Sequence, residues 1–154
     1  MDGVKILIML GSKSDIEAVS GCGEILNKFN IPFRQEISSA HRQPARTIEL
    51  LKKAEAEGVK IIIAAAGMAA HLPGFIASHT ILPVIGVPLS GSALGGLDSL
   101  YSIVQMPAGV PVATMAIGSQ GAKNAALMAV EILALSHSEL KAKLEGYRKE
   151  LAGG

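Results

Sequence analysis

The sequence predicts an α/β protein, a three-layer α/β/α sandwich around a parallel sheet of about five strands. Apolar runs typical of buried strands alternate along the chain with segments whose apolar residues recur at helical spacing. Such alternation requires right-handed crossovers, so the strands run parallel and helices cover both faces of the sheet. The 154 residues contain no linker or repeat, which predicts a single domain over 1–154.

The first half of the chain predicts two strand and helix pairs. Residues 4–10 form a continuous apolar run typical of a buried strand. Apolar positions over 16–29, including the single Cys22, then mark one face of a helix. Residues 32–37 alternate and predict the second strand. Pro44 suits the first turn of the next helix, which Gly58 ends.

The second half repeats this rhythm and adds one helix. We expect strands at 59–66, 83–87 and 112–117 and helices at 69–78, 97–104, 122–135 and 138–151. The whole arrangement is flavodoxin-like. The final helix carries Leu140, Leu144, Tyr147 and Leu151 on one stripe beyond the last crossover, which suits packing on a neighbouring subunit.

Composition limits the possible functions. Hydrophobic residues make up 49% of the chain and charged residues 18%, and mean hydropathy is +0.41, an apolar surplus that predicts a homo-oligomer. No uninterrupted apolar run reaches about 18 residues, and residues 1–5 lead directly into a strand, so neither a membrane span nor a signal peptide is expected. The single Cys22 fits a reducing cytoplasm. A net charge of +1 predicts no nucleic-acid partner.

The first polar motif, Gly-Ser-Lys-Ser-Asp at 11–15, directly follows the first strand. At the carboxyl edge of a parallel sheet, loops and helix amino termini converge on ligands, so Ser12, Ser14 and Asp15 are candidate binding residues. The alternative is a turn with a helix N-cap, because Ser and Asp commonly cap helices. The chain has no Walker A loop and no Gly-x-Gly-x-x-Gly after a strand, so an ATP or dinucleotide site has no support.

The second motif, Ser-Ala-His-Arg at 39–42, follows the second strand. It places the guanidinium of Arg42 beside His41, a side chain that titrates near neutral pH, and this pair suits phosphate binding next to proton transfer. An isolated histidine is more often structural or merely exposed. The neighbouring 11–15 loop favours the functional interpretation, with a small phosphorylated sugar derivative as ligand.

The third motif spans 64–74, where Ala and Gly after a strand allow a close approach of backbone to ligand and His71 faces the same edge. Tight packing of helix on sheet explains the small residues equally well. We interpret His79 and His137 as surface or packing residues. Four scattered histidines and one cysteine give no metal-ligand spacing, so no metal is expected.

Together with further segments, these motifs cover nearly the whole chain: Gly-Val-Pro at 86–88, the stretch 98–107, Gly-Val-Pro-Val at 109–112 and Lys-Asn-Ala-Ala-Leu at 123–127. In this order and spacing they resemble the N5-carboxyaminoimidazole ribonucleotide mutase family of purine biosynthesis. The resemblance implies an isomerase without a cofactor. The carboxylate of its substrate leaves the exocyclic nitrogen as carbon dioxide and joins ring carbon C4 to give 4-carboxy-5-aminoimidazole ribonucleotide.

The same resemblance implies a role for each matched residue. His41 is the catalytic acid and base. Ser12 and Asp15 hold the ribose side of the nucleotide, and Arg42 binds the phosphate with Ser14 and Ser39. His71, with the 66–70 backbone including Ala70 and the adjoining Leu72, lines the carbon dioxide end. The family also implies a cytoplasmic homo-octamer with active sites near subunit interfaces, and the 90–96 loop is a candidate lid.

The chain departs from the family at Ala65 and Met68, where many members have Gly, so the pocket loop is expected to differ in width or path.

A related branch, the direct aminoimidazole ribonucleotide carboxylases, uses free carbon dioxide. That branch carries Lys after the catalytic His and lacks the 69–74 motif, so Arg42 and His71 favour the mutase branch. Two further alternatives are a flavodoxin-like module that binds FMN or another nucleotide, and a noncatalytic assembly subunit.

Overall fold

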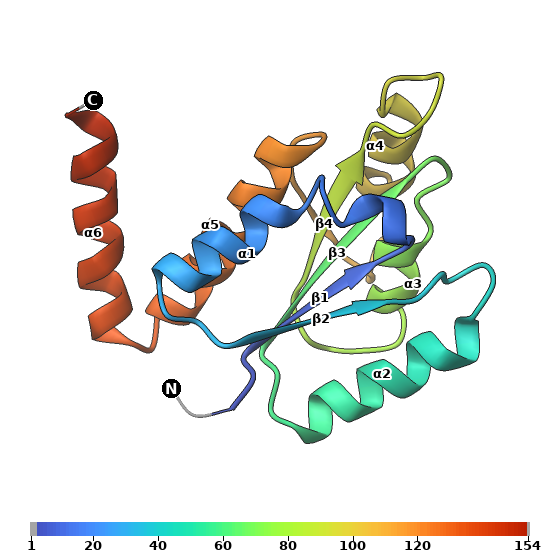
Figure 1. The fold of residues 1–154 in the computed structure, drawn as a ribbon. Helices are drawn as coiled ribbons and strands as arrows, with labels where there is room; N and C mark the ends of the chain where they lie inside the picture. Colours follow the sequence, from blue (N-terminus) through green and yellow to red (C-terminus); the bar gives the residue numbers. More distant parts are fainter. Residues whose placement is uncertain (1–2, 154) are drawn as a thin grey trace.

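The structure of the chain is a computed structural model that describes residues 3–153 (Figure 1). Its central sheet is parallel, with the strand order β2-β1-β3-β4-β5. This is the order of flavodoxin-like folds, as predicted. The strands are β1 Ile6–Leu10, β2 Phe33–Ile37, β3 Ile61–Gly67, β4 Val84–Leu89 and β5 Ala113–Thr114.

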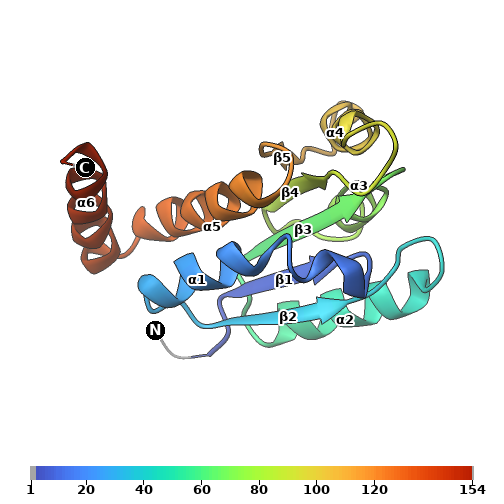
Figure 2. The same cartoon turned by 45° about the horizontal axis from the view of Figure 1, so that its top comes forward.

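Helices cover both faces of the sheet. They are α1 Ser20–Lys28, α2 Pro44–Ala56, α3 Leu72–Ala77, α4 Leu97–Val104, α5 Ser119–Ala134 and α6 Ser138–Ala152, with a short 3-10 turn η1 at Lys13–Asp15. Helices α1 and α5 lie on one face, and α2, α3 and α4 pack on the other (Figure 2). The predicted three layers are therefore confirmed.

The continuous apolar character of β1 reflects burial on both faces. Ile6, Ile8 and Leu10 point into the core below α1 and α5, whereas Leu7 and Met9 point into the core shared with α2 and α3. All five side chains are fully buried. Because alternate strand residues face opposite sides, a strand covered on both sides needs an apolar residue at every position.

Two predicted boundaries were wrong in ways that change the path of the chain. Two other helices also differ from the prediction, because α3 begins at Leu72 and not at 69, and α5 begins at Ser119 and not at 122. The first helix was expected from Ile16, but Ile16 is 43% exposed and α1 begins only at Ser20, because the chain first makes the tight turn η1. The fifth strand was expected over 112–117, but β5 is only Ala113–Thr114. Beyond it the chain turns at Gly118 (φ 80°) into α5, with the Gly118 N–H donating to the Pro88 carbonyl (2.8 Å).

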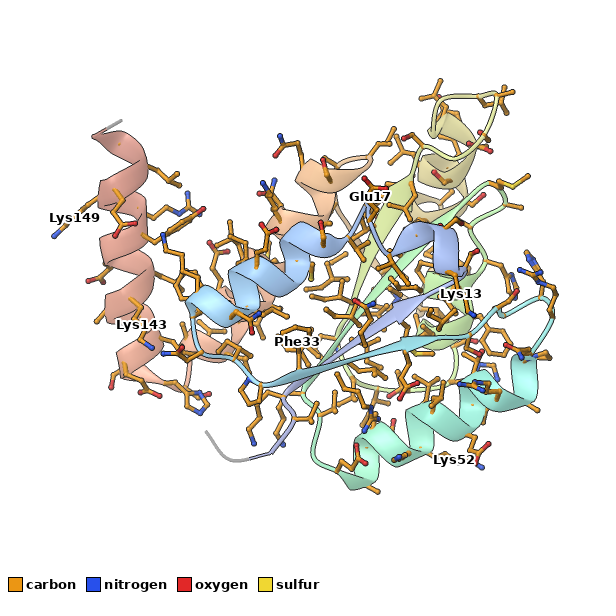
Figure 3. All side chains as sticks on the ribbon, viewed as in Figure 1. Lys13, Glu17, Phe33, Lys52, Lys143 and Lys149 are labelled. Atoms are coloured by element: carbon orange, nitrogen blue, oxygen red, sulfur yellow. The ribbon has the colours of Figure 1, made fainter. Side chains whose placement is uncertain are left out.

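Helix α6 lies beyond the end of α5, outside the three layers (Figures 1 and 2). Leu140 is buried against the body of the chain, and the Tyr147 ring packs edge-on against Phe29 at 5.7 Å between centroids. Leu151 is 60% exposed, and Lys149 points away from the rest of the molecule (Figure 3). The predicted apolar stripe therefore packs partly on its own chain and leaves its end exposed.

Across residues 3–153, no helix is long and apolar enough to cross a membrane. Cys22 lies in the core, as predicted, where burial raises the pKa of its thiol to about 12. That pKa keeps the sulfur protonated at neutral pH, so Cys22 acts as a packing residue.

Candidate active site

Strand register brings the three predicted motifs together. Leu10, the last residue of β1, is aligned with Ile37 of β2 and with Ala65 of β3. The ladder continues past these ends, because the Gly11 N–H donates to the Ala65 carbonyl (3.2 Å) and the Ser38 N–H donates to the Leu10 carbonyl (2.9 Å). The loops that follow the three strands must therefore leave the sheet side by side, at the end toward which the arrows point in Figure 1.

The first loop is held by its own side chains. The Ser12 N–H donates to Asp15 Oδ2 (2.9 Å), and the Ser14 N–H donates to Ser12 Oγ (3.3 Å), which together form a capping box around η1. Partial burial raises the pKa of Asp15, partly offset by hydrogen bonds from the Ser12 backbone and the Ser14 side chain. The N-cap interpretation is thus correct, and the same residues still face the pocket.

A buried pair of hydroxyls anchors the second loop. Ser38 and Thr47 are both fully buried, and their oxygens lie 2.8 Å apart, which ties the end of β2 to the first turns of α2. Above this anchor, Ser39 Oγ accepts from the Arg42 backbone N–H and from Arg42 Nε, both at 3.4 Å. Arg42 and His41 remain exposed at the mouth of the pocket. The guanidinium therefore keeps donors free for a ligand.

The third loop brings a second imidazole to the first. The rings of His41 and His71 stack, with centroids 4.7 Å apart and planes inclined by 22°. Burial, and then the charge of His41, lower the pKa of His71. At neutral pH the neutral form of His71 is therefore favoured. Two imidazoles in contact, one of them biased to the neutral form, suit proton transfer to and from a bound ligand.

A cavity of about 530 Å³ joins the three loops. All nine candidate residues line it: Ser12, Ser14, Asp15, Ser39, His41, Arg42, Ala70, His71 and Leu72. Its remaining wall is formed by residues 66–69 at the end of β3 and just beyond it, and by Gly11, Ala40 and Gly91. The structure thus brings together every residue that the sequence singled out. A cavity of this size accommodates a ligand of nucleotide dimensions.

Sequence reasoning assigned no role to several residues of the site. An adjoining hollow of about 410 Å³ shares Arg42 and Ser39 with the main cavity and adds Lys13 and Gln43. Lys13 projects from η1 (Figure 3) and adds a second cation near Arg42. Its place within the 11–15 motif could have indicated this role from the sequence. The buried pair of Ser38 and Thr47 carried no such signal, because Ser and Thr side chains are mostly exposed in proteins.

The departure from the family at Met68 has a visible consequence. Met68 lines the cavity, is 62% exposed and adopts a left-handed backbone conformation with φ of 57°, where glycine is the favoured residue. Ala65, by contrast, is fully buried within β3. The Met68 side chain therefore adds apolar bulk to the rim of the pocket, while the strand below it is undisturbed.

The residues that line the cavity do not suit a metal ion or a flavin. Within residues 3–153, no group of three or more His, Cys, Asp or Glu side chains is placed to hold a metal ion. Of the described residues that line the cavity, none is Phe, Tyr or Trp, so an isoalloxazine ring would find no aromatic partner of that kind for stacking. The lining favours a polar, phosphorylated ligand instead.

Fold and site define an α/β enzyme with a pair of imidazoles at the carboxyl edge of a parallel sheet. The chain belongs to the AIR carboxylase family, whose model matches residues 5–153. The N5-carboxyaminoimidazole ribonucleotide mutase of Pyrococcus horikoshii is 55% identical over 144 residues, which cover 94% of this chain and 80% of that protein. The mutase of Escherichia coli K12 is 50% identical over 145 residues, which cover 94% and 86%.

A solved structure agrees with these sequence relatives. The crystal structure of Treponema denticola PurE superposes with a TM-score of 0.88 at 30% identity, and the match covers 96% of this chain and 91% of that one. The resemblance inferred from the motifs and the predicted fold class are therefore both confirmed.

Proposed function

We propose that this chain is an isomerase of purine biosynthesis that converts N5-carboxyaminoimidazole ribonucleotide into 4-carboxy-5-aminoimidazole ribonucleotide, with His41 as general acid and base. The observation that carries the proposal is the stacked pair of His41 and His71 in a cavity that also contains Arg42. Relatives that are 50% to 55% identical over nearly the whole chain carry the name of this activity. The conversion neither oxidises nor reduces the substrate.

The proposed reaction balances with one acid–base group. The bond between the exocyclic nitrogen and the carboxylate breaks and releases carbon dioxide, and the nitrogen takes a proton from His41. Ring carbon C4 then attacks the retained carbon dioxide, and the C4 proton returns to His41. An imidazole suits this exchange because its ordinary pKa lies near the working pH.

The cavity offers a separate region for each end of the nucleotide. Arg42, which donates to Ser39, would hold the phosphate together with Ser39 and Ser14, and Ser12 and Asp15 would hold the ribose. A guanidinium matches phosphate oxygens with directional, charge-assisted hydrogen bonds. The other end is lined by His71, Leu72 and the small residues of 66–70, a low-polarity wall that would keep carbon dioxide close to C4.

We further propose a cytoplasmic homo-octamer in which a neighbouring subunit closes the open side of the cavity. Helix α4 and the loop before it expose Leu94, Leu97, Tyr101 and Val104, which are between 48% and 64% exposed and recur at helical spacing. Such a stripe is apolar surface that a subunit contact would cover. The 90–96 loop contains both Gly91, which lines the cavity, and Leu94 of this stripe, which suits a lid.

The competing function is direct carboxylation of aminoimidazole ribonucleotide by free carbon dioxide, the activity for which the family is named. Purified protein should be incubated with each substrate, with and without bicarbonate, while the formation of 4-carboxy-5-aminoimidazole ribonucleotide is followed. We expect rapid conversion of the N5-carboxylated substrate without added bicarbonate. Turnover only of the uncarboxylated nucleotide, and only with bicarbonate, would overturn the proposal.

A further inference from the structure

A continuous stack of rings runs from the active site along α3. His71 stacks on His41, the ring of Phe75 lies 5.5 Å from His71 at an inclination of 46°, and the ring of His79 lies 4.4 Å from Phe75 at 29°. Residues 71, 75 and 79 follow one another at intervals of four, the spacing that places side chains above one another on a helix. His71 thus contacts two other rings, those of His41 and Phe75.

The position of the Phe75 ring is fixed from several directions. The Phe75 N–H donates to the His71 carbonyl (2.9 Å), so the two residues share the first turn of α3. The ring is partly buried against the core that contains Leu72 and Ile76. On its far side, the His79 ring is held in place because His79 Nδ1 lies 2.8 Å from the Phe75 carbonyl and 2.9 Å from Ser78 Oγ.

The His71 imidazole is held by contacts with other rings and not by hydrogen bonds. His71 is exposed, and no hydrogen bond of its imidazole is found among the described residues. Ring contacts with His41 and Phe75 are therefore the interactions that define its orientation. A side chain without such contacts would sample several rotamers.

We propose that Phe75 is a positioning residue that holds the His71 imidazole stacked against His41. The positioning of His71 by Phe75 is a property of the substrate-free protein and does not depend on the proposed function. Only the expected effect on kcat rests on that function. With the ring of Phe75 in place, His71 stays stacked on His41 in the wall of the cavity. Without that ring, His71 turns away and the reacting groups lose their alignment.

The test compares Phe75→Leu, which removes the ring and keeps an apolar side chain, with Phe75→Tyr, which keeps the ring. Phe33→Leu is the matched control, because Phe33 lies on β2 among the residues packed under α1. In substrate-free protein, NMR should show weaker cross-relaxation between the His41 and His71 rings in Phe75→Leu. The titration midpoint of His71 should also rise toward 6.5, because both causes of its lowered pKa weaken when the ring turns into solvent.

The charged and titratable side chains around the same cavity are Asp15, His41 and Arg42, with His79 beyond Phe75, and none of them is altered in these variants. We expect kcat to fall about 10-fold in Phe75→Leu, with a smaller change in KM, because misplacement of a group in the site affects the reaction more than binding. Phe75→Tyr and Phe33→Leu should keep the wild-type titration and kcat.

Unchanged cross-relaxation and an unchanged His71 midpoint in Phe75→Leu would overturn the proposal, even in a protein inactive on the proposed substrate. A fall in kcat that also occurs in Phe33→Leu would show a loss of stability in place of positioning. If Phe75→Leu fails to fold, Phe75→Met fills more of the same space and takes its place in every measurement.

Discussion

The proposed chemistry depends on His41 more than on any other side chain. His41 lines the cavity in contact with His71, whereas the residues proposed to bind the phosphate are Arg42, Ser39 and Ser14. His41→Asn keeps a polar side chain and removes the titrating ring. We expect turnover to fall by about 100-fold to 10,000-fold, the range typical of lost acid–base catalysis, while nucleotide affinity stays close to that of the wild type.

His137→Asn is the matched control for this substitution, because His137 lies at the start of α6, outside the cavity. Steady-state kinetics and calorimetric binding of the product nucleotide separate the two effects. Near-normal turnover of His41→Asn would remove His41 from the proposed role.

The pH dependence of His71 follows from its lowered pKa. In the unfolded chain a histidine titrates near 6.5, and burial together with the charge of His41 moves the folded value below this. The unfolded state therefore binds more protons in that window, so stability falls as pH drops from 6.5 through the folded pKa of His71. Above 6.5 the contribution is complete.

NMR titration of the ring protons should give a His71 midpoint below 6.5. In His41→Asn that midpoint should rise only part of the way back, because the charge of His41 is lost but the burial remains. A wild-type midpoint at or above 6.5 would show that the stacked geometry does not persist in solution.

Arg42 should affect binding more than turnover. It donates to Ser39 through Nε and has further N–H groups for a phosphate. Arg42→Ala is expected to weaken binding of the product nucleotide, and added salt should narrow the difference from wild type, because salt screens exposed charges. Arg46→Ala is the control, because Arg46 lies in the first turn of α2 and outside the cavity. Equal calorimetric affinities for wild type and Arg42→Ala would place the phosphate elsewhere.

The nine candidate residues were predictable because each is tied to a strand end by sequence position alone. Strand register then converts three sequence motifs into one site. The left-handed backbone at Met68 was less predictable, because methionine gives no hint of positive φ. Phe75 was missed for a different reason: at helical spacing an aromatic residue is normally a core residue, and only the ring contacts reveal its relation to His71.

Among the elements, α6 contributes both to the stability of its own chain and to the proposed assembly of subunits. Deletion of residues 138–154 should lower the mass of the particle and the activity, because the exposed end of α6, which carries Leu151, would no longer be able to pack on a neighbouring subunit. The deletion also uncovers Phe29 and removes the ion pair between Lys28 and Glu150 (3.0 Å), so thermal stability should fall as well. Loss of the buried Leu140 alone costs about 2 kcal/mol.

Light scattering, thermal unfolding and activity should be measured on the same sample of the deletion variant. Lys149→Ala is the control, since Lys149 points away from the body of the chain (Figure 3). A stable, fully active monomer after the deletion would contradict the shared site. If conditions that reassemble the oligomer of the deletion variant also restore its activity, the result would support a site shared between subunits.

Element type was predictable from periodicity, whereas two boundaries were not. The pattern from Ile16 onward has helical spacing, but the capping box of Ser12 and Asp15 favours a 3-10 turn first and delays α1 to Ser20. Likewise, the apolar residues after Thr114 could continue a strand. The edge position of β5 and the turn at Gly118 end it early, and neither feature is visible in hydrophobic periodicity.

For the molecule as a whole, the apolar surplus predicted from composition appears on the surface. Ile81 and Leu135 are almost fully exposed, in addition to the stripe on α4. A chain with this surface is expected to bury it between copies, which agrees with the proposed octamer. Composition indicates that an exposed apolar surface exists. Only the fold shows that part of this surface, at Leu94, belongs to the 90–96 loop next to the cavity.

In the proposed reaction the carboxyl group moves within one enclosed site, from the exocyclic nitrogen to C4. The most direct measurement uses substrate with a carbon-13 carboxylate, in excess unlabelled bicarbonate, with the product analysed by mass spectrometry early in the reaction. We expect nearly all of the label in the C4 carboxylate of the product, because carbon dioxide is retained beside His41 and His71. An unlabelled product would show that the carboxyl group comes from solution, and would assign the chain to direct carboxylation instead.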